Sequence, residues 1–156
     1  MANAHEPLAS LLTAYLAADY RWEWRGQWCP LVIGQCAPEV SDAFPDAGQF
    51  GLLSAWNPYS VARQRQANQV ADAALHAALI GSCKSLQPAF ASARDRSWKE
   101  PGWLIVDVLQ TELDALAHQF GQLGTLWWQR DQPIRLRMGT RQPATAPGHA
   151  FVDWLK

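Results

Sequence analysis

This sequence has no long apolar run and only a small net charge, and each of these properties argues against a class of protein. No stretch reaches the ~20 consecutive apolar residues that a membrane-spanning helix needs. The formal net charge is −1, so bulk charge gives nucleic acid no electrostatic attraction. Residues 1–6 lack the basic and apolar regions of a signal peptide. We expect a cytoplasmic protein without a membrane segment, for which nucleic acid is a disfavoured partner.

Cysteine and histidine are scarce and scattered, which argues against a metal site. There are three cysteines and four histidines: Cys29, Cys36, Cys83, His5, His76, His118 and His149. No two of them have the spacing of structural zinc ligands. A glycine-rich phosphate loop and a nucleophile elbow are also missing. We expect reduced thiols, no metal and no cofactor; a nucleophilic Cys29 or Cys83 with a distant histidine stays as a minor alternative.

Tryptophan, by contrast, is abundant. The 156 residues include nine tryptophans, and 49% of the chain is hydrophobic while 17% is charged. This balance is typical of a globular protein with a substantial core. The length predicts a single domain, residues 1–156. Each tryptophan brings a large apolar area and one N–H group that requires a partner when it is buried.

The strand that organises the chain is predicted at residues 50–56, an apolar run that ends at Asn57-Pro58. Because this run is apolar on both faces, it belongs in the middle of a sheet. The elements predicted after it are a helix at 60–80, strands at 84–93 and 103–108, a helix at 111–120 opened by a capping box of Thr111 and Asp114, and a strand at 125–129. This order predicts an α+β fold whose core, residues 50–129, is a ferredoxin-like split β-α-β unit (βαββαβ) with an antiparallel sheet.

An N-terminal helix and β-hairpin extension, residues 7–34, precedes this core, and a C-terminal tail, residues 139–156, follows it. The elements predicted outside the core are a helix at 7–18, strands at 20–25 and 28–33 joined by a turn at Gly26-Gln27, a short helix at 38–44, a strand at 134–138 and a docked tail at 151–155. Pro30 places the strand at 28–33 at a sheet edge. Arg135 and Arg137 are expected to point outward.

Both faces of the predicted sheet are apolar, and the two long helices cover only one of them. In the strand at 20–25, Tyr20, Trp22 and Trp24 point one way by period-two alternation. We interpret this row as cover for the second face. Two alternatives stay open: the row is a stacking platform for bases or sugars, or a second copy of the chain covers that face.

Several short motifs together resemble an uncharacterised bacterial family, the domain of unknown function 3293. They are Ala55-Trp56-Asn57-Pro58-Tyr59-Ser60, Asn68, Trp98-Lys99-Glu100-Pro101 and Phe120-Gly121-Gln122. The resemblance covers roughly residues 20–128. It implies that these polar residues matter for folding or function, and it implies no activity.

The loop after Trp56 is the first candidate site. Asn57 and Ser60 can each cap the helix predicted at 60–80, because a side-chain oxygen accepts from free N–H groups. The same helix start can instead hold an anion, with Arg63 adding positive charge. Asn68 lies on a polar stripe of that helix, and we expect its amide to bond a neighbouring strand or loop.

Glu100 is the candidate acid. It stands between Trp98 and Trp103, and a carboxyl group among apolar rings has a raised pKa, which suits a general acid. The alternative is a glutamate of a hairpin turn in water. Gln122 follows the helix-ending Gly121, where it satisfies loop backbone groups or lines the site.

The predicted topology brings these residues to one end of the sheet. The strand at 50–56 ends where the hairpin with Glu100 turns and where Gln122 starts the last strand. We therefore expect Asn57, Glu100 and Gln122 to converge at one rim, with Asn68 roughly 12 Å lower along its helix.

Three functions remain open from the sequence. The first is a binding or catalytic site for a small anionic ligand, formed by Trp56, Asn57, Ser60, Arg63, Asn68, Trp98, Glu100 and Gln122. The second is a protein-interaction or self-association module that uses tryptophan-rich surface, and an exposed apolar patch would identify it. The third is single-stranded nucleic-acid binding, which needs exposed aromatic side chains interleaved with arginine.

Overall fold

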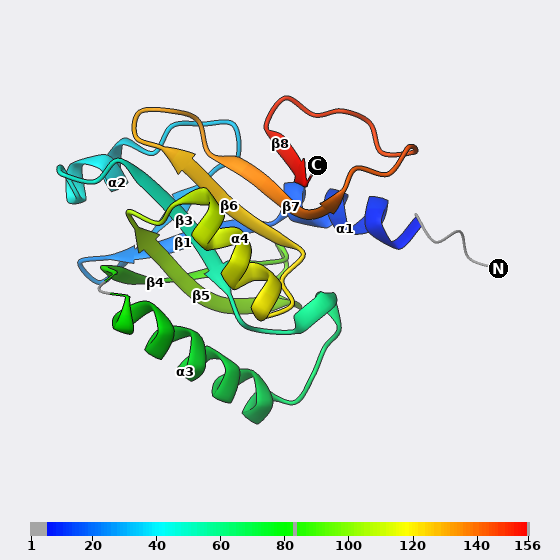
Figure 1. Ribbon diagram of the computed structural model, residues 1–156, viewed down its shortest axis with the longest axis horizontal. Helices are drawn as coiled ribbons and strands as arrows, with labels where there is room; N and C mark the ends of the chain where they lie inside the picture. Colours follow the sequence, from blue (N-terminus) through cyan, green and yellow to red (C-terminus); the bar gives the residue numbers. More distant parts are fainter. Residues whose placement is uncertain (1–5, 83, 156) are drawn as a thin grey trace.

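The computed structural model describes residues 6–82 and 84–155 and has an α+β architecture (Figure 1). In this part of the chain, four α-helices accompany one eight-stranded sheet, whose strand order is β2-β1-β4-β5-β3-β6-β7-β8. The sheet is mixed, since β8 runs parallel to β7 while the other neighbouring strands are antiparallel. The candidate residues His5 and Cys83 lie outside the described residues.

The elements follow the expected order along the chain. The helices are α1 (Glu6–Ala17), α2 (Pro38–Ala43), α3 (Arg65–Gly81) and α4 (Gln110–Gln119), with a 3-10 turn, η1, at Pro58–Ser60. The strands are β1 (Asp19–Trp24), β2 (Gln27–Leu31), β3 (Gln49–Ser54), β4 (Leu86–Ser92), β5 (Lys99–Val106), β6 (Gly124–Gln129), β7 (Arg135–Arg141) and β8 (Val152–Leu155). The C-terminal tail therefore docks as a full strand. None of the described helices has the length and apolar character to cross a bilayer.

Strand β3 is central, as its apolar sequence predicts. It pairs antiparallel with β5 on one side and with β6 on the other. Phe50 and Leu52 enter one hydrophobic cluster, whereas Leu53 and Ala55 enter another on the opposite face. A strand with two buried faces has no solvent side, and this explains the uninterrupted apolar run.

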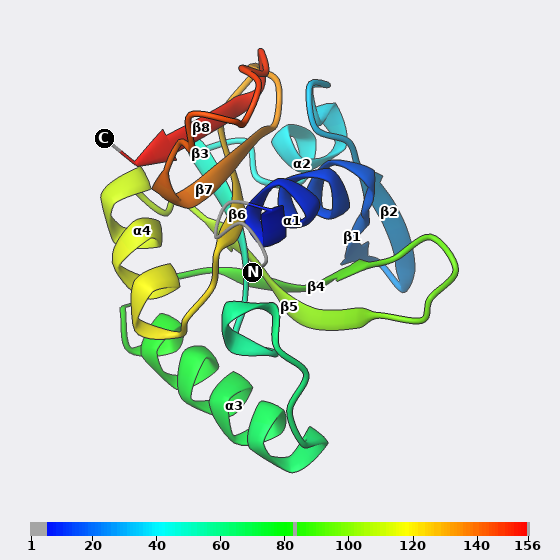
Figure 2. The same cartoon turned by 90° about the vertical axis from the view of Figure 1, so that its right-hand side faces the viewer.

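The sheet curls around α1 and α2, and α3 and α4 pack on its outer face (Figure 2). An isolated bridge between Ile33 and Ile134 joins the far end of β2 to the start of β7 and tightens the curl. Tyr20 and Trp22 are buried in the inner cluster. The expectation that the chain covers its own second sheet face is confirmed, and Trp24, the third aromatic residue of β1, is half-buried against the same cluster.

The hairpin turn was predicted one residue too late. Trp24 pairs with Gln27, so the two-residue loop is Arg25-Gly26. Both loop residues have positive φ, 51° and 77°. This is the left-handed conformation that the twist of a two-residue hairpin favours, and Gly26 adopts it at no steric cost. Strand β2 is an edge strand and accommodates Pro30, as expected.

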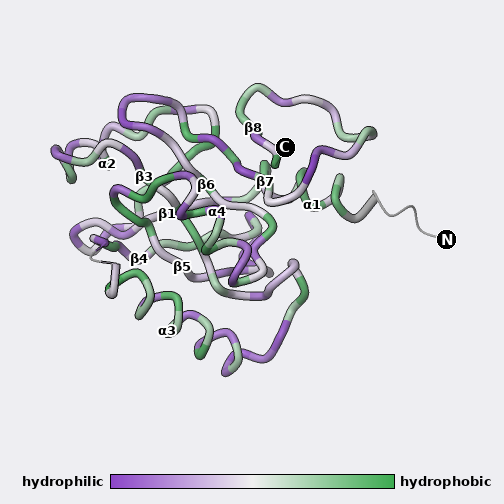
Figure 3. The backbone as a smooth tube through the Cα atoms, viewed as in Figure 1, coloured by the Kyte–Doolittle hydropathy of each residue, from purple (hydrophilic) through white to green (hydrophobic). Residues whose placement is uncertain are grey.

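Helix α3 begins at Arg65, not at Ser60. The turn η1 ends at Ser60, and Tyr59 and Ser60 both have φ of 58° there. The buried residues of α3 are Asn68, Leu75 and Leu79, so its buried face includes part of the expected polar stripe. Figure 3 shows the chain turning hydrophilic in the segment just before α3.

The predicted capping box of α4 was also wrong. Glu112, not Asp114, accepts a hydrogen bond from the backbone N–H of Leu109, at 3.2 Å. Asp114 instead forms a bidentate ion pair with Arg137 of β7, with N–O distances of 2.6 and 2.7 Å. Arg135 pairs in the same way with Asp153 of β8. The two arginines lie on one face of β7, as alternation predicts, but both are paired rather than free.

Candidate functional site

An apolar cavity opens at the end of the sheet where β4 ends and β5 begins. Its volume is about 280 Å³. The lining comes from α1, β1, β4, β5, the hairpin between β4 and β5, and the turn η1: Leu11, Ala14, Tyr15, Ala18, Tyr20, Ser60, Ala91, Ser92, Ala93, Trp98 and Glu100. Glu100 is the sole side chain in this lining that carries a charge near neutral pH.

Glu100 lies in β5, opposite Ala91 of β4, and not in the hairpin turn. One of its carboxyl oxygens, Oε1, accepts a hydrogen bond from the indole Nε1 of Trp98. Burial raises the pKa of Glu100 to about 7, and the Trp98 hydrogen bond opposes that rise only in part. The carboxyl group is therefore partly ionised at neutral pH.

No basic side chain in the described part of the chain forms an ion pair with Glu100. The three nearby basic residues have other partners. Arg94 donates to the carbonyl of Ala17, Arg96 pairs with Asp19 at 2.7 Å, and Lys99 lies over the Phe90 ring. Alternation along β5 sends the Lys99 and Glu100 side chains to opposite faces. The carboxyl group therefore faces the cavity without a counter-charge.

Two tyrosines form the polar part of the cavity wall beside Glu100. The hydroxyl of Tyr15 lies 3.2 Å from Ser60 Oγ, and the hydroxyl of Tyr20 donates to the backbone carbonyl of Tyr15. Burial raises the pKa of both hydroxyl groups, so both stay neutral near pH 7. Gly124 allows this packing, because a Cβ there would lie 3.0 Å from the Tyr15 ring.

A smaller cavity, of about 50 Å³, lies behind Glu100 and reaches Gln122. Tyr15, Tyr20, Ala91 and Glu100 line both cavities. The side-chain amide of Gln122 donates to the carbonyl of Trp56, at 2.9 Å. Gln122 thus lies on the inner side of Glu100, away from the outer cavity.

Asn57 and Asn68 form a reciprocal pair of amides and do not cap a helix. Asn57 N donates to Asn68 Oδ1 at 2.9 Å, and Asn68 Nδ2 donates to Asn57 Oδ1 at 2.8 Å. Both residues are buried. The expected separation of Asn68 along the helix was wrong, because α3 starts later and its first turn folds back on Asn57.

Arg63 completes this cluster instead of facing an anion. Its Nε donates to Asn68 Oδ1 at 2.7 Å, and its Nη2 donates to the carbonyl of Ala55 at 3.0 Å. Its backbone N–H donates to Asn57 Oδ1 at 3.2 Å. The three side chains hold the loop 57–64 in shape, and that loop delivers Ser60 to the cavity wall.

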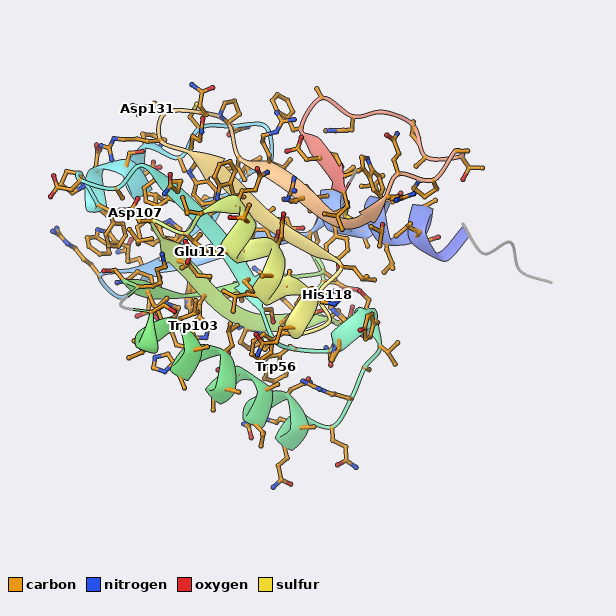
Figure 4. The ribbon with its side chains drawn as sticks, viewed as in Figure 1. Trp56, Trp103, Asp107, Glu112, His118 and Asp131 are labelled. Carbon is orange, nitrogen blue, oxygen red and sulfur yellow. The ribbon has the colours of Figure 1, made fainter. Side chains whose placement is uncertain are left out.

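The Trp-Asn-Pro and Phe-Gly-Gln motifs contact each other. Tyr59 N donates to the carbonyl of Gly121 at 2.7 Å, beside the bond between Gln122 and Trp56. Gly121 has φ of 67°, and a Cβ there would lie 2.7 Å from Pro58 Cβ. Figure 4 shows Trp56 at the sheet end next to α3 and His118 on the neighbouring α4. The glycine is needed both for its conformation and for this close approach.

The candidate residues therefore fall into two groups at one end of the sheet. Ser60, Trp98 and Glu100 line the outer cavity, and Gln122 lines the inner one. The other four do not line these cavities: Trp56, Asn57 and Arg63 lie in the loop between β3 and α3, and Asn68 lies in the first turn of α3. Sequence reasoning missed Tyr15, and it interpreted Tyr20 only as cover for the second sheet face. No local pattern in the sequence signals the cavity, because α1 meets β4 only through tertiary packing.

No cluster of three or more potential metal ligands occurs among the described side chains.

The raised pKa of Glu100 makes stability depend on pH in a definite direction. The folded pKa of about 7 exceeds the ordinary value of 4.5, so the folded state binds the proton more tightly. This contribution to stability is complete below about pH 4.5 and is lost as pH rises through 7. We expect wild type to lose stability relative to Glu100→Gln between pH 5 and pH 8, measured by urea unfolding. Glu39→Gln, at an exposed position of α2, should parallel wild type; a parallel Glu100→Gln curve would contradict the prediction.

Residues 53–124 match a family model described as protein of unknown function (DUF3293). The resemblance inferred from the motifs is thereby confirmed over this segment. It contains Glu100, Ser60, Trp98 and both interlocking motifs, whereas α1 with Tyr15 lies outside it. No curated protein and no solved structure matches the chain.

Proposed function

We propose, for a chain whose residues 53–124 match this family of unknown function, that the cavity around Glu100 binds a small, largely apolar molecule. The observation that carries the proposal is a carboxyl group without a counter-charge, facing an otherwise apolar cavity. Ligand sites combine apolar walls with a few polar groups that orient the ligand. Glu100, Ser60 and the Tyr15 hydroxyl are those groups here.

The geometry argues against the anionic ligand that was expected from the sequence. That expectation required a helix start at Ser60 with Asn57 and Arg63 facing a ligand. Helix α3 starts at Arg65, and both side chains bond inward. The charge that faces the cavity is a carboxylate, which repels anions. A neutral or cationic ligand fits this wall.

A pKa near 7 also equips Glu100 for proton transfer at neutral pH, because a general acid or base works best when its pKa is close to the working pH. The proposal is for binding. Turnover would require a ligand with a transferable proton within hydrogen-bond reach of Glu100.

For the fold, we propose that residues 50–129 form the ferredoxin-like βαββαβ core, within one domain of residues 1–156. The strand order β4-β5-β3-β6 with antiparallel neighbours supports this assignment. Strands β1, β2, β7 and β8 extend the sheet on both sides. Helix α1 lines the cavity together with strands of the core, which supports a single domain for the extension and the core.

The two other functions have weaker support from the geometry. Among the nine tryptophans, only Trp28 and Trp98 count as exposed, at 42% and 36%. A tryptophan-rich docking surface therefore has few members, and the aromatic row of β1 faces the core. A homodimer, a cytoplasmic location and a bacterial source stay predictions from the sequence.

Filling the cavity should abolish binding. Ala14 lines the cavity from an exposed position of α1, so Ala14→Phe is expected to block it without disturbing the core. The measurement is saturation-transfer NMR with indole, phenol and cyclohexanol as probes. We expect a signal for at least one probe with wild type and none with Ala14→Phe.

Ala17→Phe is the matched control, because Ala17 is exposed on the same helix and is not part of the cavity lining. It should retain the signal. Equal signals from both variants would place probe binding elsewhere and refute the proposed site.

A further inference from the structure

We infer that the cavity selects molecules that carry one ammonium group on an apolar body, with the ammonium bound at Glu100. This inference rests on the proposed function and names the ligand class of the same site. Three properties of the cavity support it: an unpaired carboxyl group, free hydrogen-bond acceptors, and a lining of apolar and aromatic side chains.

The charge balance is incomplete without a cation. Buried carboxylates in proteins are normally paired with a basic group, and removal of a partner leaves a costly unpaired charge. Glu100 has no such partner among the described residues. The neighbouring Arg94, Arg96 and Lys99 bond elsewhere. A ligand that brings a positive charge supplies the missing partner, and one that brings a negative charge adds repulsion.

The free hydrogen-bonding capacity also favours a donor ligand. Trp98 Nε1 occupies Oε1 of Glu100, and no hydrogen bond from a described residue reaches Oε2. Ser60 Oγ and the Tyr15 hydroxyl share one hydrogen bond and have further lone pairs. An ammonium group has three donors and no acceptor. It therefore complements the three acceptor oxygens that Glu100, Ser60 and Tyr15 bring to the cavity lining.

The walls suit the rest of such a molecule. Leu11, Ala14, Ala18 and Ala91 provide an apolar lining, and the cavity of about 280 Å³ is just below the range for drug-sized ligands. The rings of Tyr15, Tyr20 and Trp98 line the same space. Aromatic faces attract organic cations when they lie within about 6 Å.

The affinity should depend on pH in a direction that distinguishes this ligand class. An ammonium group binds the ionised form of Glu100, whose pKa is about 7. Tyr15 and Tyr20 stay neutral because burial raises their pKa values, and arginine and lysine side chains stay charged. The affinity should therefore increase as pH rises from about 5.5 to about 8, until the amine itself loses its proton.

The test compares three probes of similar shape by isothermal titration calorimetry: 2-phenylethylammonium, 2-phenylethanol and 3-phenylpropanoate. At about pH 8 we expect the ammonium to bind about tenfold or more tightly than the alcohol, a difference of about 1.4 kcal/mol, and the carboxylate to bind most weakly. At about pH 5.5 the preference for the ammonium should disappear. Glu100→Gln should remove the preference for the ammonium over the alcohol at both pH values.

If the alcohol binds as tightly as the ammonium at pH 8 and Ala14→Phe blocks both, the ammonium inference is wrong but the proposed site is retained. A tighter carboxylate also overturns the inference, and binding of none of the three at millimolar concentration overturns both. If Glu100→Gln does not fold, wild type at pH 5.5 answers the same question, because its carboxyl group is then protonated.

Discussion

Gly102→Ala is expected to lower the free energy of unfolding by about 3 kcal/mol or more, or to prevent folding. Gly102 lies in β5, directly opposite Ser54 of β3. A Cβ at this position would lie 2.5 Å from the carbonyl oxygen of Leu53 and 3.0 Å from its carbonyl carbon. Both are backbone atoms of the central strand, so no side-chain rotation relieves the clash. The two strands would have to separate at the end of the sheet that holds the cavity.

Gly81→Ala is the matched control for this substitution. Gly81 is the last residue of α3, and among the described residues outside its own helical turn a Cβ there would meet no atom within 4 Å. Because alanine has the higher helix propensity, Gly81→Ala should be neutral or stabilise by up to about 1 kcal/mol. Urea unfolding measures both variants. A Gly102→Ala protein within about 1 kcal/mol of wild type would show that β3 and β5 are not packed as described.

Asn68→Ala is expected to destabilise the protein by about 2–4 kcal/mol, because it leaves several buried polar groups without partners. Asn68 accepts from Asn57 N and from Arg63 Nε, and its amide donates to Asn57 Oδ1. Truncation removes both an acceptor and a donor from a site that water does not reach. Gln69→Ala, at an exposed position of the same helix, should change stability by less than about 0.5 kcal/mol.

A double-mutant cycle with Asn57→Gly tests whether the two amides act as one unit. Asn57 has φ of 47°, and glycine keeps that conformation accessible while removing the amide. Once either side-chain amide is removed, the hydrogen bonds between the two residues are already broken, so removing the second amide costs little further stability. The double variant should therefore be destabilised by at least about 1 kcal/mol less than the sum of the single effects. Additive effects within about 0.5 kcal/mol would refute the reciprocal pair.

Much of the fold and part of the site could be predicted from local pattern. The alternation of Tyr20, Trp22 and Trp24 predicted a strand with one buried face, and the structure buries Tyr20 and Trp22 and half-buries Trp24. The positive φ of Gly121 ends α4 where the sequence indicated. The sequence predicted a raised pKa for Glu100, and the direction of that shift agrees with the structure. The cause differs from the predicted wall of two tryptophans, because the Trp98 indole opposes the rise and Trp103 does not line the cavity. The strand and the helix end depend on side-chain periodicity and local conformation, whereas the burial of Glu100 depends on tertiary packing.

The sequence by itself thus determined the order of elements, the central position of β3 and the residue types that gather at one end of the sheet. Only the tertiary structure decided which of those residues line the cavity and which hold the neighbouring loop. Asn57 and Asn68 are eleven positions apart, and their mutual hydrogen bonds hold the loop that ends in α3, so a local capping rule misplaced the helix start. Tyr15 reaches Ser60 across forty-five positions because α1 packs inside the curl of the sheet. That packing forms the cavity. It depends on contacts between segments far apart in the sequence, which local hydrophobic periodicity does not predict.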